Sequence, residues 1–356
     1  MMHNFVYEAL PMRVRFGDHA LEQLPEELEA LGGTNAVVLT TPEQAELGEH
    51  VNSILGAAGR GVYPRAAMHV PLSTAHAARD HVAEVGADTV ISVGGGSTTG
   101  LGKAIALHSD IPIIAVPTTY AGSEMTPIWG VTDQSVKRTG RDPRVLPRAV
   151  IYDPTLTVGL PVKVSVTSGL NAVAHAVEGL YAPDASPIIS LMAAEGITKM
   201  LSALPAITTE PTSSDGRSDA LYAAWLCGAV LGATTMGLHH KLCHILGGTF
   251  DLPHADTHAI VLPYVMAFNL RATPTARAVL QRATGSATPA TSVRNLGLQL
   301  GIPASLAEIG MPDDGLSEVI RQAVDAPYSN PRTVTETDLT DLLTAAYTGS
   351  DPDEEY

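Results

Sequence analysis

Short apolar runs alternate with helical stretches through the first part of the chain. Up to about Pro154, runs rich in β-branched residues are separated by segments rich in Ala, Leu and Glu. The clearest runs are the expected strands 36–40, 88–93 and 111–116. Such alternation is typical of βαβ units. We therefore predict an α/β dinucleotide-binding domain with a mostly parallel sheet over residues 1–157.

After Pro154 the apolar positions follow the period of an α-helix over long stretches. Residues 188–203 and 219–246 are the clearest examples, and strand candidates are few. This pattern predicts an all-helical second domain over residues 158–356. Its last residues, 350–356, are acidic, and we expect them to fray.

Composition and charge narrow the class of protein. A chain of 356 residues with 45% hydrophobic residues is long enough to bury two cores. The formal net charge of −16 disfavours nucleic acid and anionic membranes as partners, although local cationic side chains can still bind a small anion. No secretory signal or uninterrupted transmembrane run is visible, and Cys227 and Cys243 both lie in apolar helical sequence. We expect a cytoplasmic protein without disulfides.

A glycine-rich loop follows one of the expected strands and precedes an expected helix over residues 98–107. The loop consists of Gly94, Gly95, Gly96 and Ser97. Bare backbone lets a pyrophosphate approach closely, and the amides at a helix N-terminus face its charge. The spacing is not G-x-G-x-x-G. The loop predicts a phosphate cradle, with a tight structural turn as the alternative.

A hydroxyl-rich segment follows the next expected strand. Thr118 and Thr119 come directly after Pro117. Ligands gather at the carboxyl ends of parallel strands, so this segment is expected beside the glycine loop. The two threonines are candidates to bind the nicotinamide, the ribose or the phosphates, and a turn that caps a helix is the alternative.

Several of the thirteen histidines are spaced four residues from another polar residue. Asn171 and His175 share one helix face, as do His240 and His244. His254 follows soon after, with a further histidine four residues on. Such pairs indicate a metal site or a set of hydrogen-bond donors, whereas a lone histidine is usually an ordinary core or surface residue.

These pieces occur in the order of the iron-containing alcohol dehydrogenase family, which the chain resembles over nearly its whole length. The resemblance rests on the GGGS loop, on 117–119 with 122–124, on the Asn171/His175 helix, on 240–244 with Gly247, on Pro253-His254, on Leu262-Pro263, on Phe268-Asn269 and on 330–332 with Asp338-Leu339. The resemblance implies a first domain that binds NAD(P), a helical second domain, and an active site in the cleft between them.

The same resemblance carries over a set of metal-ligand positions. Family members that use a metal bind it through an Asp and a His on one helix and through two later histidines. These positions correspond here to Asn171, His175, His240 and His254, while His244 lies near the nicotinamide and is not a ligand. The Asp position is occupied by Asn, whose amide supplies no anionic oxygen. We expect catalysis without a metal.

Several segments are similar to the maleylacetate reductases of this family. They are 98–103, 119–126 and 137–147. This resemblance implies reduction of the carbon–carbon double bond of maleylacetate to 3-oxoadipate, in the breakdown of resorcinol-like and chlorinated aromatics. It also suggests a homodimer.

The expected catalytic residues for this chemistry are histidines. His244 is the first choice as hydrogen-bond donor and proton source, with His240, His254 and His175 beside it. The substrate is a small dicarboxylate, so cationic and polar anchors are needed. The candidates are Asn171, Lys241, Tyr328 and Arg332.

The cofactor is expected to be NADH or NADPH. Thr41 follows the strand at 36–40, where NAD-restricted family members often carry an Asp against the ribose hydroxyls. Without that acid a 2′-phosphate is not repelled, so we expect both cofactors to be accepted. Lys137 is a further candidate to contact the cofactor, and a surface lysine is the alternative.

Three other functions are compatible with parts of the pattern. One is a metal-dependent alcohol or glycerol dehydrogenase that tolerates Asn171. Another is a sugar-phosphate cyclase similar to dehydroquinate synthase, which would need an acidic metal ligand and a basic phosphate-binding set. The third is a dinucleotide sensor that binds NADH and turns nothing over.

Overall fold

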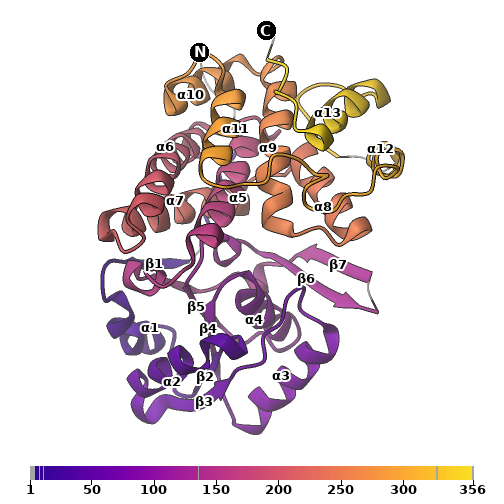
Figure 1. Cartoon of the computed structure of the whole chain (residues 1–356). Coiled ribbons are helices and arrows are strands. Elements are labelled where there is room, and N and C mark those ends of the chain that lie inside the picture. The colour runs from indigo at the N-terminus through magenta and orange to yellow at the C-terminus, as the bar shows by residue number, and fades with distance from the viewer. Residues whose placement is uncertain (1–4, 8, 11, 135, 326–327, 355–356) are drawn as a thin grey trace. The chain divides into compact units, whose positions relative to one another are not determined.

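The computed structural model describes residues 5–7, 9–10, 12–134, 136–325 and 328–354. It divides the chain into two compact units (Figure 1). The α/β unit comprises Ala9–Leu160 with Thr212–Leu221. The helical unit comprises Pro161–Pro211 with Tyr222–Tyr356, together with the N-terminal residues 5–7. The predicted fold class, a parallel-sheet domain followed by a helical one, is confirmed. The predicted domain limits, 1–157 and 158–356, stay a prediction.

A six-stranded parallel sheet lies at the centre of the α/β unit. In sheet order the strands are β1 (Arg13–Phe16), β8 (Ala149–Tyr152), β5 (Ile113–Pro117), β4 (Thr89–Gly94), β2 (Ala36–Leu39) and β3 (Gly59–Tyr63). Each neighbouring pair is parallel. The three strands expected from the sequence are β2, β4 and β5, with ends shifted by one or two residues.

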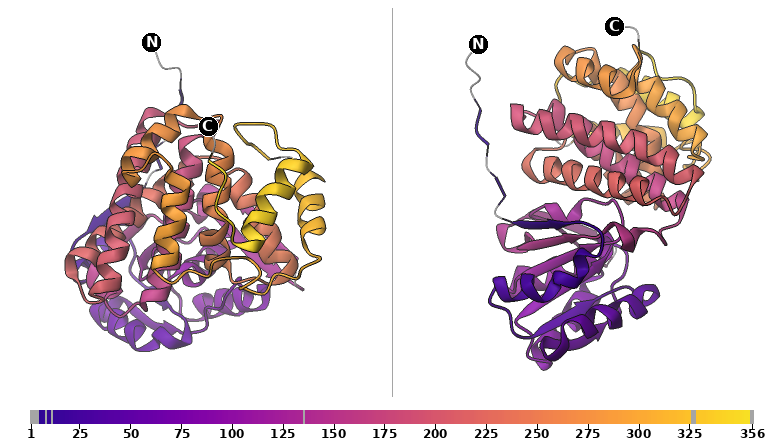
Figure 2. Two further views of the ribbon diagram at one scale, coloured as in Figure 1. Left: turned by 45° about the horizontal axis from the view of Figure 1, so that its top comes forward. Right: turned by 90° about the vertical axis from the view of Figure 1, so that its left-hand side faces the viewer.

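Helices cover both faces of this sheet (Figures 1 and 2). They are α1 (Leu24–Ala30), α2 (Ala45–Ile54), α3 (Leu72–Glu84) and α4 (Gly96–Ser109). Alternate side chains of β2 point to opposite faces. Val37 and Leu39 lie in the core formed with α3 and α4, whereas Ala36 and Val38 lie in the core formed with α1 and α2. Burial on both faces explains why the strands are apolar throughout. A hairpin of β6 (Ile128–Asp133) and β7 (Val136–Arg141) completes this unit.

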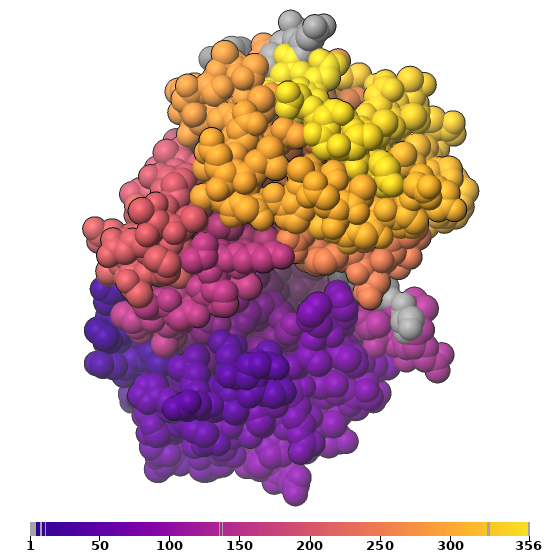
Figure 3. Space-filling view, viewed as in Figure 1, coloured from indigo at the N-terminus to yellow at the C-terminus, as the bar shows by residue number. Residues whose placement is uncertain are grey.

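The helical unit is built around two buried helices, α5 (Val162–Leu180) and α9 (His254–Leu270), which pack against each other. The other helices are α6 (Pro187–Thr209), α7 (Ser214–Ala233, which begins in the α/β unit), α8 (Leu238–Phe250), α10 (Pro274–Thr284), α11 (Pro289–Gln299), α12 (Leu316–Asp325) and α13 (Glu336–Thr348). In the space-filling view, the last part of the chain covers much of the visible face of this unit (Figure 3).

The helical stretch predicted over 219–246 is interrupted by a short break. The chain forms α7 and α8 instead, and their axes differ by 96°. The break ends at Gly237, where a Cβ would lie 2.7 Å from the carbonyl oxygen of Ser329. Because only glycine allows this close approach, the sequence turns here and begins α8 with a new direction.

The frayed acidic tail is a second correction, for residues 350–354. Asp351 forms an ion pair with Arg294 at 2.9 Å. The Glu354 carboxylate accepts hydrogen bonds from the backbone N–H groups of Ala290 (3.0 Å) and Thr291 (2.7 Å). These amides belong to the first turn of α11, where a negative charge is favourable. The acidic residues therefore hold the tail in place.

One helix of the described chain, α6, reaches the length and hydropathy of a membrane span. It is 23 residues long, and 39% of its most apolar window is buried. α6 packs on α5 and α10 and carries Glu195 and Lys199 near its middle. Core helices of folded units have the same properties, so length and composition alone are weak evidence for a membrane span.

Candidate active site

The glycine loop joins β4 to α4 as a phosphate cradle requires. β4 ends at Gly94, whose φ of +144° is a conformation that other residues rarely adopt. α4 begins at Gly96, two residues earlier than expected, so Ser97 lies in its first turn. Gly96 is exposed, and the nearest atom to an added Cβ is 3.9 Å away. A phosphate can therefore approach the exposed amides at the start of α4.

The hydroxyl-rich segment lies beside this loop, as predicted. The backbone N–H of Thr118 donates to the carbonyl oxygen of Gly94 at 3.1 Å. Thr119 packs against Gly95, where an added Cβ would be 3.1 Å from its side chain. Gly94, Gly95, Gly96, Ser97, Thr118 and Thr119 therefore share one edge of the sheet.

A third strand end contributes Gln44, which the sequence reasoning missed. Thr41 precedes the short 3-10 helix η2 (Pro42–Gln44), and Gln44 donates from Nε2 to Thr118 Oγ1 at 2.9 Å. The segments after β2, β4 and β5 thus form one polar edge. Their contact with the ribose and phosphates of a dinucleotide stays a prediction. Lys137 lies in β7, and its side chain is outside the described residues.

Lys103 anchors the loop that continues from these threonines. It is 1% exposed, and its Nζ donates to the carbonyl oxygens of Ser123 (2.6 Å) and Ile128 (2.8 Å) and to Thr126 Oγ1 (2.9 Å). Burial lowers the Lys103 pKa to about 7. Nearby Glu124 accepts a hydrogen bond from the Tyr152 hydroxyl at 2.7 Å, and burial raises the pKa of Glu124.

The histidines expected in the helical unit come together from three helices. α5 supplies Asn171 and His175, α8 supplies His240 and His244, and α9 begins at His254. The ring centroids of His175 and His240 are 5.0 Å apart, those of His240 and His244 are 6.2 Å apart, and those of His244 and His254 are 6.4 Å apart. The four predicted catalytic histidines therefore form one cluster, while their roles stay predictions.

The cluster has a buried half and an exposed half. His175 and His240 are buried, and His175 Nδ1 lies 2.9 Å from His240 Nε2. His244 and His254 are exposed. Lys241 and His244 line the same hollow, with Ile245, Gly248, Thr249 and Gln322. A small molecule can reach the exposed half.

Glu178, one turn after His175 on α5, is a functional candidate that the sequence reasoning missed. Its Oε2 lies 2.6 Å from His240 Nδ1. It also accepts hydrogen bonds from the backbone N–H groups of Gly237 (3.0 Å) and His239 (2.7 Å) at the start of α8. Burial alone would raise the pKa of this carboxyl, but the hydrogen bonds from His240 and from the backbone N–H of Gly237 lower it to about 2. Glu178 is therefore ionised although it is buried.

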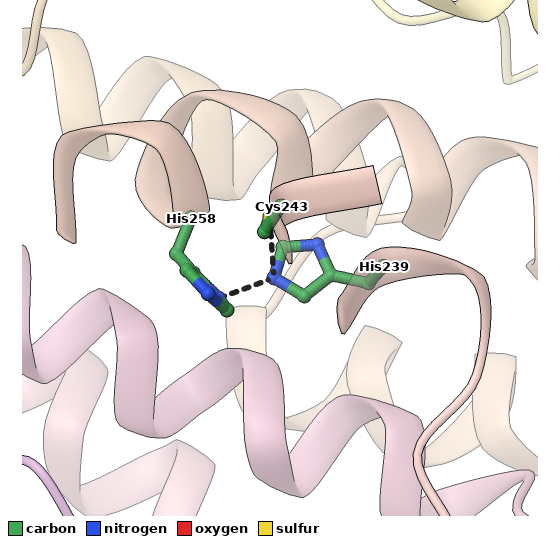
Figure 4. Close-up of side chains that lie close together, drawn as sticks. All are labelled: His239, Cys243 and His258. Carbon is green, nitrogen blue, oxygen red and sulfur yellow. Dashed lines mark hydrogen bonds between the residues drawn. The ribbon is translucent and has the colours of Figure 1, made fainter. Parts of the chain in front are cut away.

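Two further histidines complete the buried side, and neither was named as a site residue from the sequence. His239 Nε2 lies 2.9 Å from His258 Nδ1 and 3.7 Å from Cys243 Sγ (Figure 4). Burial lowers the pKa of His239 to about 3 and that of His258 well below its usual value, so both rings are neutral. Burial also raises the pKa of the Cys243 thiol. Cys227 and Cys243 are both free, as expected.

The remaining substrate-binding candidates lie in the same unit with different surroundings. Asn171 is buried, and its Oδ1 has no hydrogen-bond partner among the described residues. Tyr328 is half-buried, which raises its pKa. The Arg332 guanidinium lies 4.0 Å from the Phe268 ring centroid and bonds Phe268 O and Asp338 Oδ1, each at 3.4 Å. Arg332 thus has structural contacts, and its role as an anchor stays a prediction.

Comparison with known proteins shows the family to which the chain belongs. Residues 11–154 match the family described as iron-containing alcohol dehydrogenase, and residues 165–347 match the C-terminal part of the same family. The chain belongs to the iron-containing alcohol dehydrogenase family. It is an oxidoreductase, and the family is NAD(P)H-dependent.

Its relatives within the family are similar over nearly their whole length. The maleylacetate reductase of Burkholderia cepacia is 53% identical over 351 residues, which cover 99% of this chain and 100% of that protein. The crystal structure of maleylacetate reductase from Rhizobium sp. strain MTP-10005 has a TM-score of 0.96 at 49% identity, covering 99% and 100% of the two chains. A putative alcohol dehydrogenase from Ralstonia eutropha JMP134 has a TM-score of 0.97 at 52% identity, with the same coverage.

The residues at the family's metal-ligand positions do not fit a divalent metal well. His175 and His240 are hydrogen-bonded to each other through Nδ1 and Nε2, and Asn171 offers no charge. Among the described residues, the group whose possible ligand atoms all lie within 4.8 Å of one another consists of His239, Cys243 and His258. None of these three residues stands at one of the family's metal-ligand positions. That group combines two neutral imidazoles with a thiol whose pKa is raised, whereas metals are bound by the thiolate. The expected absence of a metal stays a prediction.

The missed residues left little signal in the sequence. Glu178 is one acid among the 37 Asp and Glu residues, and His239 is adjacent to a histidine that had already been assigned. Spacing gave one usable hint, because His175 and Glu178 are three apart and share a helix face. Gln44 had no such hint, since its partner Thr118 is 74 residues away.

Proposed function

We propose that this enzyme reduces the carbon–carbon double bond of maleylacetate to give 3-oxoadipate, with NADH or NADPH as the reductant and without a metal. The observation that carries the proposal is the histidine cluster: two exposed imidazoles beside a buried pair that is hydrogen-bonded to itself and to Glu178. The maleylacetate reductases that match the chain from end to end support the choice of substrate.

The reaction needs a donor more than it needs a Lewis acid. When bound, NAD(P)H supplies a hydride to the carbon β to the ketone of maleylacetate, and negative charge then grows on the ketone oxygen. His244 is exposed and can donate a hydrogen bond to that oxygen and later a proton to the adjacent carbon. Removing one such donor typically lowers the rate about a hundredfold.

The two carboxylates of the substrate need hydrogen-bond or ionic partners in the helical unit near His244. Lys241 is the strongest candidate, because it lines the same hollow as His244. Asn171 is buried, and its amide NH₂ group is the part of the side chain that can donate to a carboxylate. Tyr328 and Arg332 complete the proposed set.

Cofactor selectivity depends on the residues after β2. Thr41 leaves room for a 2′-phosphate, but Glu43 lies two residues on, and a backbone hydrogen bond and a bond from Thr41 lower its pKa. This carboxylate disfavours a second anion at short range. We propose that both cofactors are accepted with less than tenfold preference for NADH, and that E43Q shifts the ratio of kcat/KM values toward NADPH. A wild-type preference above tenfold contradicts this proposal.

We also propose that the enzyme acts in the cytoplasm as a homodimer with no nucleic-acid or membrane partner. Phe5, Val6 and Tyr7 are exposed apolar residues, with 90% of Val6 accessible. A second copy that covers them would remove this apolar surface from water. Light scattering of the purified protein tests the dimer, and an F5S/V6S double variant should be monomeric if these residues form the contact.

The test of the reaction is the loss of NADH absorbance with maleylacetate, run beside simple aldehydes and ketones. We expect turnover of maleylacetate alone, and a decrease of about a hundredfold in kcat for H244Q. H76N, which changes an exposed histidine on α3, is the matched control and should retain the wild-type rate. Turnover of carbonyl compounds only would instead favour an alcohol dehydrogenase.

A further inference from the structure

Glu178 has contacts that the reaction proposed above does not by itself require. It is 1% exposed, and both of its oxygens accept hydrogen bonds from backbone amides at the start of α8. Backbone N–H groups can only donate. An ionised carboxylate is an acceptor only and can satisfy all of these donors at once. Its position at a helix N-terminus also favours the negative charge.

The direction of the bond to His240 follows from this charge. Glu178 Oε2 lies 2.6 Å from His240 Nδ1, and an ionised carboxylate has no proton to give, so Nδ1 is the donor. A neutral His240 ring then has a lone pair at Nε2. Because Nε2 lies 2.9 Å from His175 Nδ1, His175 must donate to it. The hydrogen-bond chain runs from His175 through His240 to Glu178.

We propose that Glu178 is a positioning residue that keeps His240 and His175 protonated at Nδ1 and thereby leaves His244 and His254 as the donors to the substrate. In this arrangement His240 Nε2 is occupied as an acceptor and cannot donate to an enolate oxygen. His244 and His254 are exposed and lie beside this series of hydrogen bonds, with the His244 ring 6.2 Å from that of His240. The division of roles rests on the proposed function, whereas the direction of the chain does not.

Replacing the Glu178 carboxylate by an amide should reverse the direction of the hydrogen bonds between His175, His240 and residue 178. In E178Q, an amide oxygen at the Oε1 position can still accept from the His239 N–H. The NH₂ group then lies at the Oε2 position, where it faces His240 Nδ1 and can donate to it, and where the Gly237 N–H loses its acceptor. His240 must shift its proton to Nε2, and His175 must then accept. The wrong tautomer of a catalytic imidazole can cost several orders of magnitude in kcat. We expect kcat to fall at least about tenfold in E178Q, with less than about a twofold change in KM for NADH.

The direct readout is the protonation of the histidine rings, measured by two-bond 1H–15N NMR on protein labelled at its thirteen histidines. The spectra are recorded without substrate or cofactor at about pH 8, above the ordinary histidine pKa. The H240Q variant assigns the His240 signals. Wild-type protein should show His240 protonated at Nδ1, and E178Q should show it protonated at Nε2.

Two further variants separate this role from a structural one. E178D keeps a carboxylate, and it should keep the Nδ1 form and most of kcat even if E178Q does not fold. E27Q makes the same change at another buried glutamate, 1% exposed and paired with Arg13 and Arg15, and should leave both the histidine spectrum and kcat unchanged.

The proposal is overturned if wild-type His240 is protonated at Nε2, or if folded E178Q keeps the wild-type kcat. Failure of the proposed function would look different. A wild-type protein that shows the Nδ1 form and does not turn over maleylacetate would refute the substrate and leave the direction of the chain established.

Discussion

Two buried glutamates, one in each unit, have opposite pKa shifts. Glu124 and Glu178 are 2% and 1% exposed, so burial opposes the charge of both. Glu124 accepts a hydrogen bond from the Tyr152 phenol and one from its own backbone N–H, and Lys103 nearby is already bonded to three other oxygens. Glu178 accepts hydrogen bonds from two backbone amides at a helix N-terminus and from His240 Nδ1. Burial therefore raises the pKa of Glu124, while the donors lower that of Glu178 to about 2.

The difference shows that the number and kind of hydrogen-bond donors, rather than the degree of burial, set the direction of the pKa shift of a buried carboxyl. In the α/β unit Lys103 holds the loop, and burial raises the pKa of Glu124. In the helical unit the acid holds the histidines, and its charge fixes their hydrogen bonds. Substitutions at these two sites should therefore differ in size.

The largest effect is expected from removing the charged carboxylate. E178A leaves the His240 Nδ1 proton and the amides of Gly237 and His239 without their acceptor. Each buried donor left without an acceptor costs about 1–3 kcal/mol, so these three together should cost about 3 kcal/mol or more. Urea unfolding should show a loss of that size in the free energy of unfolding. A loss below about 1 kcal/mol would show that Glu178 is not charged in the folded protein.

The next effect is expected at Lys103. K103M leaves the carbonyl oxygens of Ser123 and Ile128 without their donor, and an orphaned buried group costs about 1–3 kcal/mol. The free energy of unfolding should fall by that amount. Because this loop continues from Thr118 and Thr119, NADH binding measured by fluorescence titration should also weaken. Unchanged binding would separate the loop from the cofactor site.

The pH dependence of stability sharpens the comparison at Glu178. Its pKa is about 2 in the folded protein and about 4.3 in an unfolded chain, so its contribution is complete above pH 5 and is lost as the pH falls toward 2. Between pH 5 and pH 3, wild-type protein should lose about 2 kcal/mol more stability than E178Q, which lacks the titrating group. Parallel losses in the two proteins would contradict the lowered pKa.

The smallest effect is expected at Glu124. In E124Q the amide oxygen can still accept the Tyr152 hydroxyl, and burial, which raises the pKa of Glu124, already disfavours the charge that the substitution removes. The free energy of unfolding at pH 7 should change by less than about 1 kcal/mol. A loss as large as that of E178A would show that the two glutamates are alike after all.

The same contrast explains how much could be predicted from the sequence. The β2, β4 and β5 strands and the glycine loop were predicted almost to the residue, because apolar runs and glycines record backbone requirements locally. The histidine pairs on α5 and α8 were also predicted, because residues four apart share a helix face. Gln44, Lys103 and Glu178 were missed as functional residues. Their partners lie 20 to 74 residues away, and no local pattern records such contacts.

Turns and ends were the other source of error. The break before α8 depends on a close approach between Gly237 and Ser329, and the tail is held by Arg294 and by the first turn of α11. Each is a contact between distant parts of the chain. Periodicity continued through Gly237, and acidic composition alone predicted fraying.

The most direct test of the central claim is the rate of maleylacetate-dependent NADH oxidation by protein treated with a strong chelator and shown by elemental analysis to contain no iron or zinc. The histidine cluster and Glu178 supply the donors in our account, so the rate should equal that of untreated protein. Loss of activity on chelation, with recovery when iron or zinc is returned, would contradict a metal-free reduction.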